Sequence, residues 1–290
     1  PIVICAICLA SCGANSQPRT IKDIVYSRVG SRELHLNLTL PAEKPSKPRA
    51  AVIWVHGGGW SGGDYKDDPG VAYGLSDLGY ITGTVEYRLS GEAKYPAQIE
   101  DCKAAIRFLR KNAGKYGIDP NRIGVWGGSA GGHLVALLGT TAGIKQLEGD
   151  GRNPGFPSRV QAVCDLFGPT EFTEDSMQEY IPDVVGMVEG LLGGPVKDRR
   201  GLARLASPLE FASKDDPPFL ILHGEQDTLV PMSQSEKLRD ALKRVGVDVT
   251  LVKVKNAGHG FGPQSEPSPD EIKRIVQEFF KDKLGPAESL

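Results

Sequence analysis

Blocks of apolar residues alternate with helical patterns along most of the chain. Short apolar runs have the pattern of strands buried on both faces, at 50–57, 80–89, 122–127, 160–168, 218–224 and 249–254. Helical periodicity separates them, over 97–117, 130–142, 233–246 and 269–284. This alternation predicts an α/β fold with a mostly parallel sheet, in which ligands bind beyond the carboxyl ends of the strands.

Two segments depart from this alternation. Residues 21–40 hold two stretches of alternating apolar and polar positions, typical of an N-terminal β-hairpin. Residues 170–212 contain helical pieces and scattered prolines without a clear strand. We expect this segment to be an insertion over the sheet edge that forms a cap or wall for a substrate cleft. Residues 21–290 are then expected to form a single domain.

The first residues are apolar and then become small and polar. Residues 1–20 resemble the end of a secretory signal, without its charged start, followed by a tether at 16–20. The stretch 9–12, Leu-Ala-Ser-Cys, also resembles a bacterial lipoprotein box, in which Cys12 would carry a lipid anchor. We therefore expect export to the periplasm, the medium or a lipid-anchored position. A buried first strand is the alternative, but the segment does not alternate as a half-buried strand would.

Composition narrows the class of protein. Hydrophobic residues make up 40% and charged residues 24%, which is ordinary for a soluble enzyme. A net charge of −2 gives no basic footprint for nucleic acid, and no apolar run is long enough to span a membrane. In the body of the chain, Cys102 and Cys164 are expected to be buried free thiols, although their pairing stays open. Neither has the neighbours of a zinc ligand, so no metal is expected.

A glycine-rich turn carries the first candidate catalytic residue. The stretch 127–131 fits G-x-S-x-G and lies between the strand at 122–127 and the helix that follows. A serine on such a turn needs neighbours without bulk, because the backbone folds back closely on both sides. We therefore expect Ser129 to be a nucleophile on a strand–turn–helix elbow.

A serine nucleophile needs a base. Four histidines have other expected roles, in a surface strand, in a glycine loop, packed against the elbow and bracing a turn: His35, His56, His133 and His223. His259 remains, in the loop NAGHGFG after the last strand, with glycines on both sides that leave its imidazole free to reach a site. We expect His259 to be the general base.

The base needs an orienting carboxylate. Asp227 lies in the loop HGEQDTLVP after the strand at 218–224 and is the expected acid. Glu225 and Asp248 are competitors, and Glu225 is the second choice. The order serine, aspartate, histidine is the one that α/β-hydrolases use, and each residue lies in a separate strand-end loop.

The intermediate of acyl transfer also needs donors for its oxyanion. The run HGGGW at 56–60 follows an apolar strand and matches the oxyanion loop of esterases and lipases. We expect the amides of Gly58, Gly59 and Ala130 to donate there, since losing one such donor can cost roughly 2.7–4 kcal/mol.

Together, HGGGW, VEYRL, YPAQIEDC, GGSAGGH, HGEQDTLVP and GHGF resemble the α/β-hydrolase esterases related to hormone-sensitive lipase. The likeness is greater to the branch of small exported acetyl-xylan and feruloyl esterases, and it covers most of residues 50–282. The resemblance implies a carboxylesterase without cofactor that acts on small-molecule or polysaccharide esters through Ser129, His259 and Asp227. It places the oxyanion loop at Gly58 and Gly59. The chain departs from GDSAGG at Gly128, and only a short lead precedes residue 50 where such relatives have a large cap.

Two other readings are open. An amide hydrolase, either an arylformamidase with a similar HGG-x-W loop or a serine peptidase, would use the same groups. A catalytically inactive hydrolase fold used for binding is the other, although every expected catalytic position is filled. The sequence does not indicate an oligomeric state.

Overall fold

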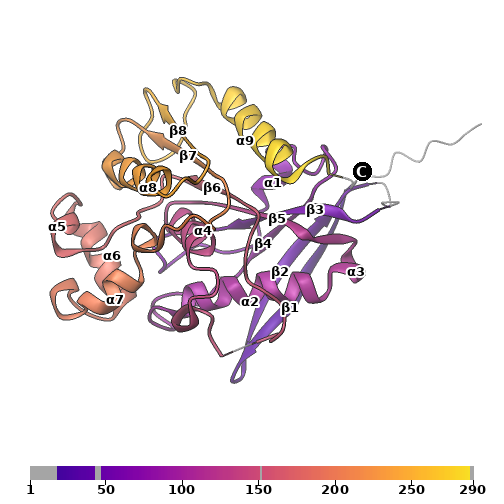
Figure 1. Cartoon of the computed structure of the whole chain (residues 1–290), viewed down its shortest axis with the longest axis horizontal. Helices are drawn as coiled ribbons and strands as arrows, with labels where there is room; N and C mark the ends of the chain where they lie inside the picture. Colours follow the sequence, from indigo (N-terminus) through magenta and orange to yellow (C-terminus); the bar gives the residue numbers. More distant parts are fainter. Residues whose placement is uncertain (1–17, 43–46, 151, 288–290) are drawn as a thin grey trace, which may run out of the picture.

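A single mixed sheet organises the molecule (Figure 1). This computed structural model describes residues 18–42, 47–150 and 152–287. Within them the sheet has eight strands in the order β1-β2-β4-β3-β5-β6-β7-β8. Their bounds are β1 (Arg19–Val29), β2 (Arg32–Leu40), β3 (Arg49–Val55), β4 (Ile81–Val85), β5 (Ile118–Gly128), β6 (Ala162–Leu166), β7 (Phe219–Gly224) and β8 (Val249–Val254).

The hairpin expected over 21–40 forms one edge of the sheet. β1 pairs antiparallel with β2, and β2 with β4, whereas the remaining neighbours are parallel. The tether was expected to reach residue 20, but its last residues belong to the hairpin, in which Thr20 pairs with Thr39. Their hydroxyl oxygens lie 3.0 Å apart. The leader and the lipid site expected at Cys12 lie outside the described residues.

Helices cover both faces of the sheet and bury a core on each. One face packs against α2 (Ala97–Lys111), α4 (Ala130–Thr140) and α8 (Met232–Arg244). The other packs against α1 (Pro69–Ala72) and α9 (Pro269–Leu284). In α9, Ile272, Val276 and Phe280 repeat every fourth position and are fully buried, each contributing about 1.5–3 kcal/mol. The α/β expectation is confirmed.

Some element bounds differ from the sequence prediction. The helix expected over 97–117 breaks at Asn112, whose side-chain amide donates to the carbonyl of Phe108 at 2.8 Å, and α3 (Ala113–Tyr116) follows. The strand expected over 80–89 is shorter and spans only Ile81–Val85. The short helix α1 has no periodic signal and was not predicted.

The segment 170–212 is helical, as expected, and contains no strand among its residues. It holds α5 (Glu174–Met177), α6 (Pro182–Leu192) and α7 (Arg200–Leu205), with short 3-10 turns η2 (Val196–Asp198) and η3 (Pro208–Phe211); η1 (Lys145–Leu147) lies earlier in the chain. It connects β6 with β7 and lies at the edge formed by the carboxyl ends of the strands. Tyr95 anchors it, since its amide donates to Leu191 O at 3.0 Å and its hydroxyl to Leu205 O at 2.7 Å.

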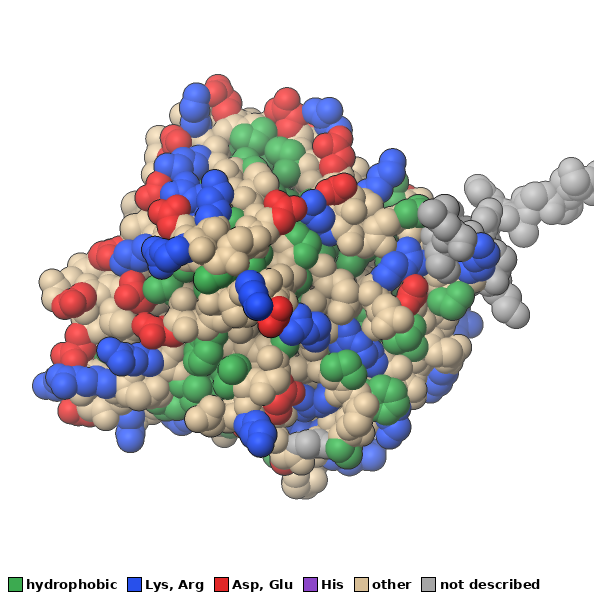
Figure 2. Space-filling view, viewed as in Figure 1, with side chains coloured by type: hydrophobic (Ala, Val, Ile, Leu, Met, Phe, Trp, Pro, Cys, Tyr) green, Lys and Arg blue, Asp and Glu red, His purple; other side chains and the backbone are tan. Residues whose placement is uncertain are grey.

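Two further expectations concern cysteines and the surface. Cys102 and Cys164 are buried and free, as predicted. Over the face drawn in Figure 2, acidic and basic side chains are interspersed. Within the described part of the chain, every helix is too short or too polar to cross a membrane.

Candidate active site

Ser129 lies on a strained turn between a strand and a helix. β5 ends at Gly128 and α4 begins at Ala130, so Ser129 is the single residue between them. Its φ of 59° and ψ of −122° are unfavourable for a residue with a side chain. The strained backbone is held by two hydrogen bonds, from Ser129 N to Leu166 O at 2.9 Å and from His133 N to Ser129 O at 3.0 Å.

The glycines around Ser129 allow close approach of backbone to backbone. A Cβ on Gly131 would lie 2.0 Å from the carbonyl oxygen of Val55, and one on Gly57 would lie 2.7 Å from that of Gly128. Any larger residue would therefore push β3 or the loop after it away from the turn. The elbow expected from G-x-S-x-G is present.

The structure brings together the serine, histidine and aspartate that the sequence singled out. The Oγ of Ser129 lies 2.8 Å from Nε2 of His259, and Nδ1 of His259 lies 2.7 Å from Oδ2 of Asp227. The serine follows β5, the aspartate follows β7 and the histidine follows β8. A hydroxyl hydrogen-bonded to an imidazole that is held by a carboxylate is the arrangement that makes serine nucleophilic.

The side chain of Asp227 is fully buried, and both of its carboxylate oxygens have partners. Oδ1 accepts the amides of Leu229 at 2.8 Å and Val230 at 2.9 Å, while Oδ2 faces His259 and also His223, whose Nε2 lies 3.3 Å away. Burial raises the pKa of this carboxyl, but the hydrogen bonds from His223, His259 and the Val230 amide outweigh it and hold the pKa well below its ordinary value. Asp227 is therefore an anion at neutral pH.

The competing acids are placed elsewhere. Glu225 is exposed, and Asp248 pairs with Lys283 at 2.7 Å. Asp227 is thus the carboxylate in contact with His259.

The expected oxyanion loop lines the same cavity as Ser129. Gly58 and Gly59 have positive φ values of 104° and 57°, and Gly58 O accepts the amides of Ser61 and Gly62 in a tight turn. Ala130 is the first residue of α4, so its N–H has no partner within that helix. The positive end of the helix and these amides favour negative charge beside Ser129.

The segment after β4 supports the oxyanion loop at both ends. The hydroxyl of Tyr87 donates to His56 O at 3.0 Å, and Ser90 N donates to Trp60 O at 2.7 Å. The ring of His56 also stacks on Tyr87, with centroids 4.2 Å apart. The loop is therefore fixed before a substrate binds.

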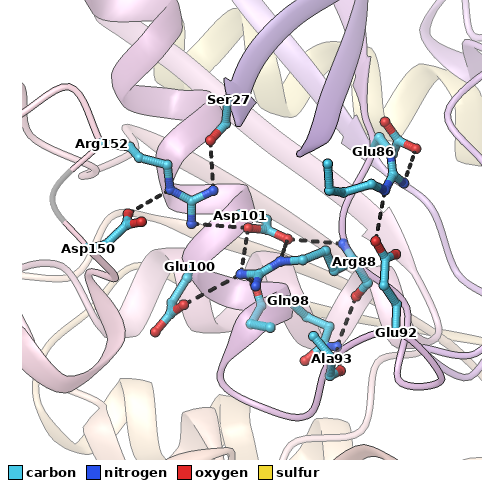
Figure 3. A network of polar contacts seen from close by, with 12 residues as sticks. Ser27, Glu86, Arg88, Glu92, Ala93, Gln98, Glu100, Asp101, Asp150 and Arg152 are labelled. Carbon is cyan, nitrogen blue, oxygen red and sulfur yellow. Dashed lines mark hydrogen bonds and ion pairs between the residues drawn. The ribbon is translucent and has the colours of Figure 1, made fainter. Parts of the chain in front are cut away.

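A buried ion cluster fixes that supporting segment in turn (Figure 3). Asp101 of α2 is fully buried and accepts both Nε and Nη2 of Arg88, at 2.8 and 2.9 Å. Arg152 lies 3.2 Å from the same carboxylate and also donates to Ser27 of β1. The bidentate geometry gives one orientation to the segment that carries Tyr87 and Ser90.

His133 joins the nucleophile helix to two other parts of the site. It is fully buried; its Nδ1 accepts the indole N–H of Trp60 at 3.1 Å, and its Nε2 donates to Ala206 O at 2.7 Å. Burial lowers its pKa to about 4, so the imidazole is neutral at ordinary pH. The sequence placed His133 against the elbow but gave no sign of these partners.

Two other histidines hold structure together. His223 braces its turn as expected, through Val230 O at 2.9 Å and Ser235 Oγ at 2.7 Å. His35 was expected on the surface but is half-buried, because its Nδ1 contacts Glu86 Oε2 at 3.0 Å.

A cavity of about 530 Å³ opens above Ser129 and His259. Its walls are mainly apolar and include Trp54, Trp60, Phe167, Val184, Met187 and Leu229. Val184 and Met187 belong to α6, so the insertion forms part of the wall, and Asp183 adds a carboxylate from the same helix. The dimensions suit an organic ligand rather than an ion.

Sequence reasoning missed Phe167. It follows β6 with a φ of 46°, and its ring lies 4.7 Å from that of His259. The sequence prediction placed Phe167 inside the strand at 160–168, whereas β6 ends at Leu166 and leaves Phe167 just beyond it, where ligand contacts are expected.

The strand order, together with a serine after β5, an aspartate after β7 and a histidine after β8, defines an α/β-hydrolase. Within that class the chain belongs to the BD-FAE family, whose model matches residues 36–242. A second model, described as TAP-like protein, matches residues 203–288.

Relatives and solved structures agree with this class. The chain is 32% identical to esterase LipQ of Mycobacterium tuberculosis, over 91% of this chain and 61% of that protein. It therefore spans about three fifths of the length of this curated relative. Among solved structures it resembles a truncated carbohydrate esterase from gut microbiota, with a TM-score of 0.79, 29% identity, and 93% and 98% of the two chains covered. It also resembles a propionate-bound esterase, Est2 of Thermogutta terrifontis, with a TM-score of 0.76, 25% identity, and 96% and 97% covered.

Proposed function

We propose that the protein is a serine carboxylesterase with Ser129 as nucleophile, His259 as general base and Asp227 as orienting acid. The hydrogen-bonded chain from Ser129 Oγ through His259 to Asp227, beside a cavity lined by Gly58, Gly59 and Ala130, carries the proposal. The names of the relatives, esterases and carboxylic ester hydrolases, support the same reaction.

In the acylation half-reaction, Ser129 Oγ attacks the ester carbonyl carbon while its proton passes to Nε2 of His259. The carbonyl oxygen becomes an oxyanion, and the amides of Gly58, Gly59 and Ala130 stabilise it. The bond from the carbon to the alcohol oxygen then breaks, and His259 gives its proton to that oxygen. Asp227 stabilises the imidazolium formed between the two transfers.

Deacylation repeats these steps with water. His259 takes a proton from the water, whose oxygen attacks the acyl carbon; the bond to Ser129 Oγ breaks, and the proton returns to the serine. The products are a carboxylic acid and an alcohol, and the side chains end as they began.

We propose that the substrates are small acyl esters, such as acetyl or feruloyl groups on xylan-type polysaccharide. The similarity to a carbohydrate esterase and the motif resemblance support this class. The apolar cavity beside Ser129 supports an organic ester rather than a charged phosphoester.

We further propose that the protein is exported, with Cys12 as a site of lipid attachment. The apolar run and lipoprotein-box pattern of residues 1–17 support this, although these residues lie outside the described part of the chain. Cell fractionation and labelling with a fatty-acid probe test it. Labelling that persists in Cys12→Ser contradicts lipidation at this position.

A panel of p-nitrophenyl, acetyl-xylan and feruloyl esters, with N-formylkynurenine and a proline-containing peptide as amides, tests the reaction. We expect ester turnover in the wild type and a loss of orders of magnitude in Ser129→Ala. Retention of more than about a hundredth of wild-type turnover by Ser129→Ala would falsify the assignment. A preference for the amides would indicate amide hydrolysis instead, and a fluorophosphonate probe that does not label Ser129 would indicate an inactive fold.

A further inference from the structure

Two aromatic side chains lie on either side of a glycine that immediately precedes the nucleophile. Trp54 comes from β3 and Phe167 follows β6, the strands on either side of β5, where Gly128 immediately precedes Ser129. A Cβ on Gly128 would lie 3.4 Å from ring carbons of Phe167 and 3.5 Å from a ring carbon of Trp54. All three residues line the cavity above Ser129. We call the space between the two rings, with Gly128 as its floor, the aromatic slot.

The walls of the aromatic slot are fixed by their own packing. The ring of Trp54 meets Trp126 edge-on, with centroids 4.7 Å apart. Phe167 meets Phe261 in the same manner at 5.3 Å, and its amide donates to Leu222 O at 2.8 Å. Its φ of 46° is an unfavourable conformation that the surroundings maintain. The positions of both rings are therefore set before a ligand binds.

The slot lies on the histidine side of the nucleophile. The ring of Phe167 is 4.7 Å from that of His259. In the proposed reaction, Nε2 of His259 gives its proton to the departing alcohol oxygen, so the alcohol part of the ester must lie near that ring. Gly59 lies elsewhere on the cavity wall, where Met187 of α6 covers it: a Cβ there would lie 2.6 Å from the sulfur of Met187.

We propose that the aromatic slot binds the alcohol portion of the ester and that the missing side chain of Gly128 sets its depth. Apolar walls built from two aromatic side chains favour a six-membered ring with apolar faces, either a pyranose or an aryl ring. This inference rests on the proposed esterase function and names the part of the substrate that the site recognises. Gly128 takes no part in bond making. It is therefore a specificity-determining residue and not a catalytic one.

Gly128 can be replaced by alanine without straining the backbone. Its φ is outside the left-handed region, and the contacts of an added Cβ are at ordinary van der Waals distance. Gly128→Ala is therefore expected to fold, and Gly128→Val adds two methyl groups beyond that Cβ, which would fill the slot further. Gly186→Ala is a matched control, because Gly186 lies in α6 with nothing within 4 Å of an added Cβ.

The experiment compares acetyl esters that differ only in their alcohol: methyl, cyclohexyl and phenyl acetate, and a methyl xyloside monoacetate. For Gly128→Ala we expect kcat/KM to fall about tenfold or more on the ring esters and much less on methyl acetate, with a larger fall for Gly128→Val. Whether the xyloside or the aryl ester loses more shows which ring the slot prefers. All four esters give the same acetyl-enzyme, so for any one variant the deacylation rate is expected to be the same with each ester.

Three results would overturn the slot assignment. These are an equal loss on all four acetates, no change on any of them, or a changed preference along methyl acetate, propionate and butyrate. The last would show that the slot holds the acyl group.

Binding separates this inference from the proposed function. In a Ser129→Ala background, quenching of tryptophan fluorescence by phenol, cyclohexanol and methyl xyloside measures slot occupancy without turnover. We expect Gly128→Ala to weaken binding of at least one of these alcohols about tenfold. Absence of Ser129-dependent turnover would contradict the esterase proposal. A weaker affinity of Gly128→Ala for these alcohols would still support the slot. Unchanged affinities for all three would reject it.

Discussion

The indole nitrogen of Trp60 donates a hydrogen bond to Nδ1 of His133 at 3.1 Å. This bond ties the oxyanion loop to the helix that begins beside Ser129. The same imidazole donates from Nε2 to Ala206 O, so the insertion is fixed to that helix as well. Three chain segments that form the cavity are thus positioned by one neutral histidine.

Removing the indole donor tests this link. In Trp60→Phe, the buried Nδ1 of His133 loses its partner, which we expect to lower the free energy of unfolding by about 1–3 kcal/mol. We also expect kcat to fall, because the oxyanion loop is less firmly held. Urea denaturation and ester kinetics measure the two effects. Tyr80→Phe is the control, since it removes a hydrogen bond to Gly285 O outside the cavity; it should reduce stability and leave kcat unchanged.

The low pKa of His133 predicts acid sensitivity. In the unfolded chain this imidazole takes a proton below its ordinary pKa of 6.5, whereas in the folded protein it does so only below about 4. The unfolded state therefore binds more protons between these values, and stability falls as pH drops through this window, by on the order of 3 kcal/mol in total. Urea denaturation from pH 7 to 4 measures the slope. His133→Gln should reduce it, and an unchanged slope would contradict this origin.

Asp165 has the opposite dependence. It is fully buried on β6, where Oδ1 accepts the amide of Gly168 at 2.9 Å, and Oδ2 has no hydrogen-bond partner among the described residues. Burial raises its pKa from 3.8 to about 6, so between these values the folded protein binds more protons and Asp165 lowers stability as pH rises. Asp165→Asn should therefore be more favourable to stability at pH 8 than at pH 4.5. Equal effects at the two pH values would contradict the shift.

Asp227 can be tested against its neighbour in the same loop. Asp227→Asn should lower kcat by about 10⁴-fold, because an amide neither stabilises the imidazolium nor holds the required tautomer. Glu225→Gln should have little effect, since Glu225 is exposed. Steady-state kinetics on one good ester decides between them, and a larger loss in Glu225→Gln would restore Glu225 as the acid.

Gly131→Ala tests the close packing of the elbow. The added Cβ would lie 2.0 Å from Val55 O, and this backbone cannot move without displacing β3. We expect a loss of several kcal/mol or failure to fold, compared with a small change in Gly186→Ala. Thermal unfolding measures both. A stable Gly131→Ala with normal activity would show that the turn is looser than the structure indicates.

The strands and long helices could be predicted from sequence because their signals are local. The α9 prediction of 269–284 is confirmed in full, since its apolar positions repeat with helical spacing between Ser268 and Gly285. The break at Asn112 could not be predicted in this way. It depends on a side-chain hydrogen bond that interrupts a pattern which continues on both sides.

The candidate site was predictable as far as each residue followed a strand. Ser129, Asp227 and His259 were found because parallel strands bring their carboxyl ends to one edge. Partners that depend on tertiary packing had no such signal. Trp60 and His133 are 73 positions apart, and the sequence shows neither the bond between them nor that Oδ2 of Asp165 lacks a partner within the part of the chain that the structure describes.

The distance along the chain between Ser129 and His259 has a consequence for biosynthesis. They are 130 positions apart, and His259 follows β8, which comes after the other seven strands of the described residues. The hydrogen-bonded chain from serine to aspartate can form only after β8 has paired with β7. A nascent polypeptide on the ribosome is therefore expected to carry Ser129 without its base until β8 and the loop after it have emerged, and labelling of Ser129 by an active-site probe would mark that step of folding.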